Sequence, residues 1–195
     1  MVITLNEVKT YKGLEDADDD ALLTVLIEAA QDWFNRECKR TVFAETDTTR
    51  YIDAIGEHLD GLDMYVSQIG DLCAISSITN GDGVAVSTNE YTTYPKVLTV
   101  EEPVFNRIRL LPSSNKYWTY TTDYENAISI TGKWGLFATA PASLKQMLKR
   151  LTLYAYKVKD TDAFETIVIP DAGMIQAPTG FPVDVARLVR LLRRP

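Results

Sequence analysis

Residues 130–148, "ITGKWGLFATAPASLKQML", contain the change of periodicity that divides the fold. Before this stretch apolar residues alternate, as in a β-strand, whereas after Pro141 they recur every three or four residues, as in an amphipathic helix. Gly132 and Gly135 flank Lys133 and Trp134. We predict a joint here, in which two glycines let the backbone turn, Trp134 anchors the turn and Pro141 fixes the start of the helix.

A glycine-flanked lysine could also indicate a phosphate-binding loop. A Walker loop requires G-x-x-x-x-G-K-[ST], however, and here Lys133 is followed by Trp134. The predicted helix begins several residues later, so its N-terminal amides could not hold a phosphate in that loop. The sequence therefore favours a mechanical joint.

Two helices are predicted before the β-rich region. Residues 3–13, "ITLNEVKTYKG", place Thr4 and Glu7 at capping-box spacing and end in Gly13. Residues 16–40 form a longer helix with Asp18 or Asp19 as N-cap. Its predicted apolar stripe is Leu22, Leu26, Ala29, Ala30, Trp33 and Phe34. The acidic run 15–20 lacks the glycine and distal glutamate of an EF-hand, so helix capping is favoured over calcium binding.

The middle of the chain, from Thr41 to about Gly135, has the period of two that indicates β-strands. A hairpin is predicted around residues 75–88, because Asn80, Gly81, Asp82 and Gly83 are turn residues between two β-branched runs. The predicted strands are 48–56, 62–70, 73–79, 83–94, 96–100, 106–111, 117–122 and 127–132.

Helical periodicity returns after Pro141 and again at the end of the chain. The first stripe comprises Leu144, Met147, Leu148, Leu151, Tyr154 and Ala155. Residues 159–182 are predicted to be a partly extended loop. The last helix has Val185, Leu188, Val189 and Leu192 on one face. We therefore predict an α+β fold, in which residues 1–40 and 136–195 form a discontinuous helical bundle and residues 41–135 form a β-rich insertion.

The charge of −7 is unevenly distributed along the chain. Residues 1–100 carry 7 Lys and Arg against 18 Asp and Glu, whereas residues 101–195 carry 13 against 9. An acidic total argues against a dedicated nucleic-acid binder. The asymmetry could serve head-to-tail association of subunits, or it could be scattered, solvated charge.

Patterns for catalysis or metal binding are absent from the sequence. His58 is the only histidine, and there is no G-x-S-x-G, H-E-x-x-H or Cys/His cluster. Carboxylate pairs such as Glu101 with Glu102, or Asp60 with Asp63, could in principle support acid–base chemistry. We predict a protein without enzymatic activity, metal or cofactor, and a hydrolase is a remote alternative.

The cysteines and the apolar runs indicate where the protein is made. Cys38 and Cys73 have no metal or redox spacing, which predicts reduced, buried thiols in a cytoplasm. No membrane span and no secretory signal are evident. We expect the protein to stay in the compartment where it is synthesised.

Three short patterns, in this order, resemble the head–tail connector (adaptor, or head-completion) proteins of tailed double-stranded-DNA bacteriophages and gene transfer agents. They are the "TLNEVK" opening, the "DDALLTVLIEAA" helix with its later Trp33, and the "ITGKWG…PASLKQ" junction. The resemblance spans nearly the whole chain. The segment from Thr41 to about Leu111 is where family members are expected to differ, and residues 113–127 fit no family pattern.

The resemblance implies a structural protein of the virion neck, at the head–tail interface, assembled in the host cytoplasm. Family members are helical bundles that assemble, typically as a dodecamer, under the portal, extend the DNA channel and dock the next neck or tail protein. Double-stranded DNA would then pass through the lumen without specific binding, because an acidic ring repels phosphates. No membrane partner is implied.

Three sets of candidate site residues follow. The family's C-terminal segment engages the portal, which implies a portal contact through Arg187, Arg190, Arg193 and Arg194, although a helix dipole alone also favours such cations. The acidic subunit-interface candidates are Asp16, Asp18, Asp19 and Asp20. The loop-tip candidates, facing the lumen or the tail, are Asn80, Gly81, Asp82 and Gly83; a turn without any partner is the other reading.

A second function stays open at this stage. The β-rich region could be a binding module of a tail or baseplate that uses its tyrosines as a contact surface, although tyrosines also suit strand packing. These are Tyr91, Tyr94, Tyr117, Tyr120 and Tyr124. A ring of about a dozen subunits would favour the adaptor, whereas a stable trimer would favour a fibre-like module.

Overall fold

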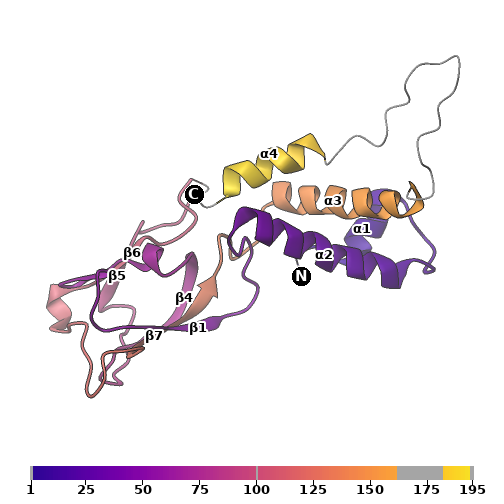
Figure 1. The fold of residues 1–195 in the computed structure, drawn as a ribbon. Helices are drawn as coiled ribbons and strands as arrows, with labels where there is room; N and C mark the ends of the chain where they lie inside the picture. The colour runs from indigo at the N-terminus through magenta and orange to yellow at the C-terminus, as the bar shows by residue number, and fades with distance from the viewer. Residues whose placement is uncertain (1, 100, 162–181, 194–195) are drawn as a thin grey trace, which may run out of the picture. The chain divides into compact units, whose positions relative to one another are not determined.

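The computed structural model describes residues 2–99, 101–161 and 182–193. Its described residues form two compact units, one from 1–39 and 140–195 and the other from 40–139. The first contains α1 (Leu5–Lys12), α2 (Asp20–Cys38), α3 (Ala142–Thr161) and α4 (Val183–Leu192). The second contains seven strands and two 3₁₀ turns, so the α+β class predicted from the sequence is confirmed (Figure 1).

The first helix begins and ends as its sequence predicts. The Thr4 side chain accepts a hydrogen bond from Glu7 N at 3.2 Å, and the Glu7 carboxylate accepts one from Thr4 N at 2.8 Å. These two bonds form a capping box. At the other end Gly13 adopts φ 75°, and its N–H donates to Lys9 O at 2.8 Å.

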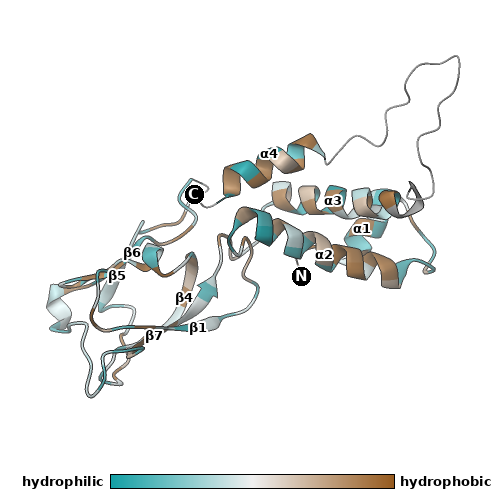
Figure 2. Cartoon of the chain, viewed as in Figure 1, coloured by the Kyte–Doolittle hydropathy of each residue, from teal (hydrophilic) through white to brown (hydrophobic). Residues whose placement is uncertain are grey.

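The buried face of α2 differs from the predicted one. Asp19 is the N-cap residue, but its side chain makes no cap hydrogen bond. The buried residues are Leu23, Ile27, Ala30, Phe34 and Cys38. The predicted stripe was therefore wrong at Leu22, Leu26 and Trp33, which are only half-buried, and at Ala29, which is exposed. The first half of α2 is apolar on almost every side, so two neighbouring stripes fit its sequence equally well (Figure 2).

Helices α2 and α3 pack side by side and run in opposite directions (Figure 1). The Tyr156 hydroxyl, near the end of α3, donates to the carboxylate of Asp19, at the start of α2. Leu144, Leu148 and Leu151 of α3 are buried, as predicted, together with Leu153. Pro141 immediately precedes α3, and its carbonyl accepts a hydrogen bond from Lys145 N at 3.1 Å. The end of α2 and the start of α3 therefore lie at the same end of this helix pair.

Helix α4 contacts both α2 and α3 through one face. Val185 is fully buried and Val189 is 8 % exposed, so the predicted apolar stripe is confirmed at these positions. The Asp184 carboxylate accepts a hydrogen bond from Arg150 of α3. These contacts fix which face of α4 remains available to solvent.

The β-rich unit has two antiparallel sheets. One has the order β1–β7–β4, formed by Thr48–Ile52, Ile128–Trp134 and Leu72–Thr79. The other has the order β2–β3–β6–β5, formed by Leu59–Asp60, Asp63–Met64, Arg107–Leu110 and Tyr91–Tyr94. The 3₁₀ turns are η1 (Val66–Gln68) and η2 (Pro112–Ser114). One apolar cluster includes residues of both sheets, among them Ile52, Met64, Leu72, Ile78, Ile108, Leu110, Ile128 and Trp134.

Several predicted strands are shorter than expected or absent. Described residues 96–99 and 117–122 form no strand, and only the last four residues of 83–94 do. The segment around Trp118 is instead held by its side chain, which is 9 % exposed and donates from Nε1 to Leu62 O at 3.0 Å. Alternating aromatic residues there indicated a strand, but irregular backbone places this tryptophan in the core.

The predicted joint at Gly132–Gly135 is also different in the structure. Gly132, Lys133 and Trp134 belong to β7, the central strand of its sheet, and neither glycine has a positive φ. A Cβ on Gly132 would lie 2.1 Å from Ala74 O, and one on Gly135 would lie 2.9 Å from Ala44 N. These glycines allow close backbone approach, and the chain turns only after the strand. Trp134 is an apolar anchor as predicted, being 4 % exposed beneath the Arg50 guanidinium.

Candidate functional site

The acidic run after α1 contains two carboxylates with a side-chain partner and two for which the described residues offer none. Asp20 pairs with Lys9, whose Nζ lies 2.6 Å from Oδ1, and Asp19 accepts from Tyr156. The same Lys9 amine donates to the backbone carbonyl of Asp16 at 2.5 Å. The side chains of Asp16 and Asp18 are exposed. Of the four subunit-interface candidates, two therefore brace the helical unit itself, and two face solvent.

Two of the four candidate portal arginines lie on α4, and a third follows it. Arg187 and Arg190 are exposed on α4, opposite the buried Val185 and Val189, and exposed Arg193 follows its last turn. Arg194 lies outside the described residues. Cations near a helix C-terminus interact favourably with the helix dipole, by about 0.3–1 kcal/mol each. The structure thus places three of the four arginines where a partner could reach them.

Apolar side chains accompany these arginines on α4. Val183 is 83 % exposed and Leu191 is 73 % exposed. The outer face of α4 therefore combines exposed guanidinium groups with aliphatic groups, as many protein-binding surfaces do.

The turn at residues 80–83 has a buried base and an exposed tip. Asn80 is 3 % exposed; its Nδ2 donates to Tyr117 O at 2.8 Å, and its Oδ1 accepts from Thr119 N at 3.2 Å. Gly81 is tightly packed, since a Cβ there would lie 2.3 Å from Thr119 O. Only Asp82 and Gly83 are exposed, and Gly83 adopts φ 79°. The candidate tip is thus reduced to these two residues, because Asn80 and Gly81 have structural roles.

Most of the tyrosines considered from the sequence are exposed in the β-rich unit. Tyr94, Tyr117, Tyr120 and Tyr124 are between 40 % and 68 % exposed. The rings of Tyr120 and Tyr124 meet edge to face, with centroids 6.2 Å apart. Tyr91 is half-buried, and burial raises the pKa of its hydroxyl. Four of these tyrosines are therefore exposed, and two of them are in contact, whereas Tyr91 belongs to the packing.

Two of the residues with potential for acid–base chemistry, His58 and Asp63, have structural partners. His58 Nε2 lies 2.8 Å from the backbone carbonyl oxygen of Asp53. Asp63 is 8 % exposed and lies 3.5 Å from Arg107 and 3.4 Å from Arg109. Among the described residues, no group of three or more His, Cys, Asp or Glu could hold a metal ion. The burial of Asp63 could not be predicted from the sequence, since Asp60, three residues earlier, is exposed.

An apolar groove lies between α2 and α3. It has a volume of about 330 Å³ and is lined by Leu26, Ala29, Ala30, Trp33, Leu151, Tyr154, Ala155 and Val158. Several of these residues were predicted to be core from their periodicity. No helix of the described part of the chain is long and apolar enough to span a membrane.

One protein-family model matches the first part of the chain. Residues 2–60, which include α1 and α2, match the family model of the phage gp6-like head-tail connector protein. A search among curated proteins finds no match.

Two solved structures share the fold over almost the whole chain. One is described as the neck of an empty gene transfer agent (GTA) particle computed with C6 symmetry, at 14 % identity and TM-score 0.54. The other is the virion of a native GTA particle, at 15 % identity and TM-score 0.52. Each alignment covers 98 % of this chain and 89 % of the other. The resemblance to head–tail connector proteins indicated by the sequence is therefore confirmed by the family model over residues 2–60, and the fold over nearly the whole chain is shared with chains of GTA particles.

Proposed function

We propose that this protein is a structural component of the virion neck, a head–tail adaptor that forms a ring under the portal. The observation that carries the proposal is the family match over residues 2–60, combined with the fold shared with chains of GTA neck and virion structures. The helical unit acts as the bundle of the adaptor, and residues 41–135 act as an insertion within it. The ring, by analogy a dodecamer, extends the DNA channel and docks the next neck or tail protein.

The charge of the chain suits a channel through which DNA moves. Each subunit carries −7, so a ring of subunits is strongly negative and repels the phosphates of passing DNA. Specific DNA binding would instead need a basic groove. The proposed role therefore needs no catalytic group, metal or cofactor, and the protein acts in the neck after synthesis in the host cytoplasm.

The portal contact is assigned to the outer face of α4. Arg187 and Arg190 are exposed there, and their backbone is anchored by the buried Val185 and Val189. Arg193 and Arg194 extend this basic end of the chain. The exposed tip at Asp82 and Gly83 is assigned to the lumen or the tail side.

Charge reversal on α4 tests the portal contact. The variant Arg187→Glu with Arg190→Glu should fold normally, because both side chains are exposed, and should attach more weakly to portal-bearing capsids. Co-sedimentation of the purified protein with capsids measures the attachment. A matched control, Lys96→Glu with Lys133→Glu, makes the same charge change in the β-rich unit and should attach normally. Unchanged attachment of the α4 variant would remove the assignment.

A tail or baseplate binding module is the second candidate function. The observation in its favour is the exposure of Tyr117, Tyr120 and Tyr124, of which the last two are in contact. Native mass spectrometry and electron microscopy of particles separate the two candidates. A ring at the head–tail junction supports the adaptor, whereas a stable trimer located in the tail supports the module.

A further inference from the structure

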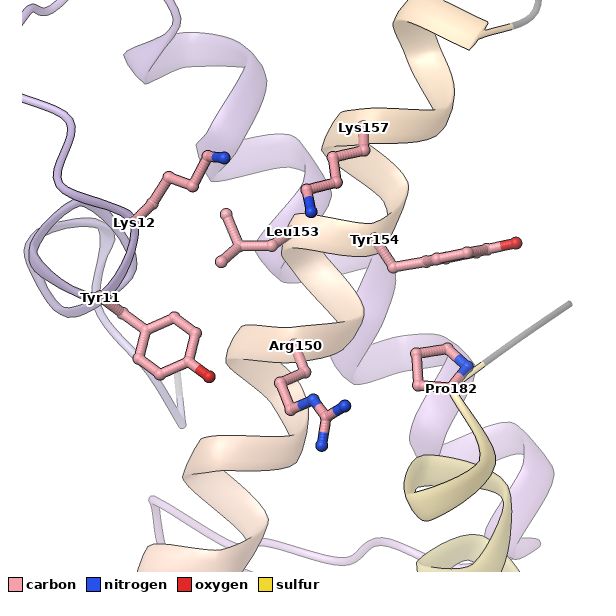
Figure 3. Close-up of a pocket in the computed structure, with 7 residues that line it drawn as sticks. All are labelled: Tyr11, Lys12, Arg150, Leu153, Tyr154, Lys157 and Pro182. Atoms are coloured by element: carbon pink, nitrogen blue, oxygen red, sulfur yellow. The ribbon is translucent and has the colours of Figure 1, made fainter. Parts of the chain in front are cut away.

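A basic pocket lies in the helical unit, where α1, α3 and the residue before α4 converge. Its volume is about 380 Å³, and its lining comprises Tyr11, Lys12, Arg150, Leu153, Tyr154, Lys157 and Pro182. Figure 3 shows Lys12 and Lys157 extending toward each other across Leu153, with the Tyr11 hydroxyl and the Arg150 guanidinium on the same side of α3. The pocket is thus an apolar floor with polar and cationic groups around it.

Among the residues that the structure describes, the positive charge of this pocket is only partly neutralised. Arg150 pairs with Asp184, which lies outside the lining. Within the described part of the chain, Lys12 and Lys157 make no ion pair, and the lining contains no carboxylate. An acidic segment would therefore gain two charge-assisted contacts here without displacing a partner among the described residues.

Residues 15–18 form an exposed acidic segment, whose charge is opposite to that of the pocket. Glu15, Asp16 and Asp18 are exposed, and their carboxylates pair with no cation among the described residues. The backbone of the segment is nevertheless anchored. The Lys9 amine donates to the Asp16 carbonyl and pairs with the Asp20 carboxylate. The Tyr156 hydroxyl donates to the Asp19 carboxylate. A segment that is already ordered loses less conformational entropy on binding.

We propose that the basic pocket of one subunit receives the acidic segment 15–18 of the next copy of the chain. This inference rests on the ring-forming function proposed above and names the contact between its subunits. The contact closes a ring when each subunit gives its acidic segment to one neighbour and its pocket to the other, which makes it heterologous. Two copies that exchanged segments reciprocally would instead form a closed dimer, so a wild-type oligomer that stops at two subunits would overturn the proposal. A symmetric pairing of two pockets would bring Lys12 and Lys157 against their own copies, which like-charge repulsion disfavours.

A charge-swap experiment tests this contact on the full-length protein. Variant A carries Lys12→Glu with Lys157→Glu, and variant B carries Asp16→Lys with Asp18→Lys. Each variant alone should associate at least tenfold more weakly than the wild type in sedimentation velocity at low salt. An equimolar mixture of A and B should regain association. The acidic pocket of A then meets the basic segment of B, and the unchanged basic pocket of B meets the unchanged acidic segment of A.

The outcomes separate this inference from the neck function. Lys96→Glu with Lys133→Glu has the same net charge as variant A and should associate like the wild type. Wild-type protein that stays monomeric, a single variant that associates normally, or an A and B mixture that does not recover would each overturn the contact. The neck function has its own test, the position of the protein in particles, and none of these results decides it.

A second measurement uses the unaltered protein, in case a variant folds poorly. Copies with and without ¹⁵N label are mixed and joined with a carbodiimide, which links amines directly to carboxylates. Lys12 or Lys157 of one copy should become linked to Glu15, Asp16 or Asp18 of a differently labelled copy. Oligomers whose links between copies fall only elsewhere would overturn the proposal.

Discussion

Gly132 lies so close to Ala74 on the neighbouring strand that a Cβ on the glycine would sit 2.1 Å from the alanine carbonyl oxygen. Any side chain at position 132 must therefore push β7 away from β4. The variant Gly132→Ala should lower the free energy of unfolding by about 2 kcal/mol, within the range measured for overpacked cores. Urea unfolding measures the change, and Ser129→Ala on the same strand should have little effect. A Gly132→Ala protein as stable as the wild type would show that the strands separate without cost.

Two adjacent leucines test which face of α2 is buried. Leu23 is 1 % exposed, whereas Leu22 is only half-buried. Leu23→Ala should cost about 2–5 kcal/mol through lost burial and the cavity that remains. Leu22→Ala removes the same atoms and should cost well under half as much. Thermal unfolding of both variants checks this, and the opposite order would favour the stripe predicted from the sequence alone.

The capping box of α1 predicts a pH dependence of stability. The pKa of Glu7 is lowered from 4.5, mainly because its carboxylate accepts a hydrogen bond from Thr4 N, with a further contribution from Lys145. A lowered folded-state pKa means that this stability is present above pH 4.5 and is lost as the pH falls through the folded-state pKa. Glu7→Gln should therefore be less stable than the wild type by about 0.5 kcal/mol at pH 7. Urea unfolding at several pH values should show the two proteins converging below pH 4.5; a constant difference would contradict the assignment.

The ion cluster around Asp63 predicts that replacing its carboxylate by an amide lowers the free energy of unfolding. Asp63→Asn leaves Arg107 and Arg109 without their carboxylate at a site that is 8 % exposed. We expect a loss of about 2 kcal/mol, below the value for a fully buried pair because the Arg109 side chain is 41 % exposed. Asp60→Asn, on the adjacent short strand, should change the free energy of unfolding by less than about 0.5 kcal/mol. Equal effects of the two variants would argue against the cluster.

Local signals predicted local structure well in this chain. The capping box of Thr4 and Glu7, the C-terminal Gly13 and the inward face of α4 are each encoded within a few residues. The α+β class also followed from the change of periodicity near Pro141. These features depend on interactions between near neighbours in sequence, so one sequence is enough to predict them.

Features that depend on distant partners were not predictable in the same way. In the sequence Gly132 resembles a turn residue, but in the structure it allows the close approach of Ala74 on the neighbouring strand. Leu26 resembles a core residue, but it lines the groove between α2 and α3. Asp19 and Asp20 were grouped with Asp16 and Asp18 as interface carboxylates, although their partners are Tyr156 and Lys9. The basic pocket combines residues more than 130 positions apart, and no local pattern marks it.

The antiparallel packing of α2 and α3 has a consequence for how such chains can diversify. Since the end of α2 and the start of α3 lie at the same end of the helix pair, the helical unit needs only a short connection between Cys38 and Ala142 to remain closed. Residues 39–141, which lie between them, can thus be lengthened, trimmed or exchanged during evolution without separating the helices. Relatives with unrelated middles could keep one assembly plan while changing what they present to their neighbours.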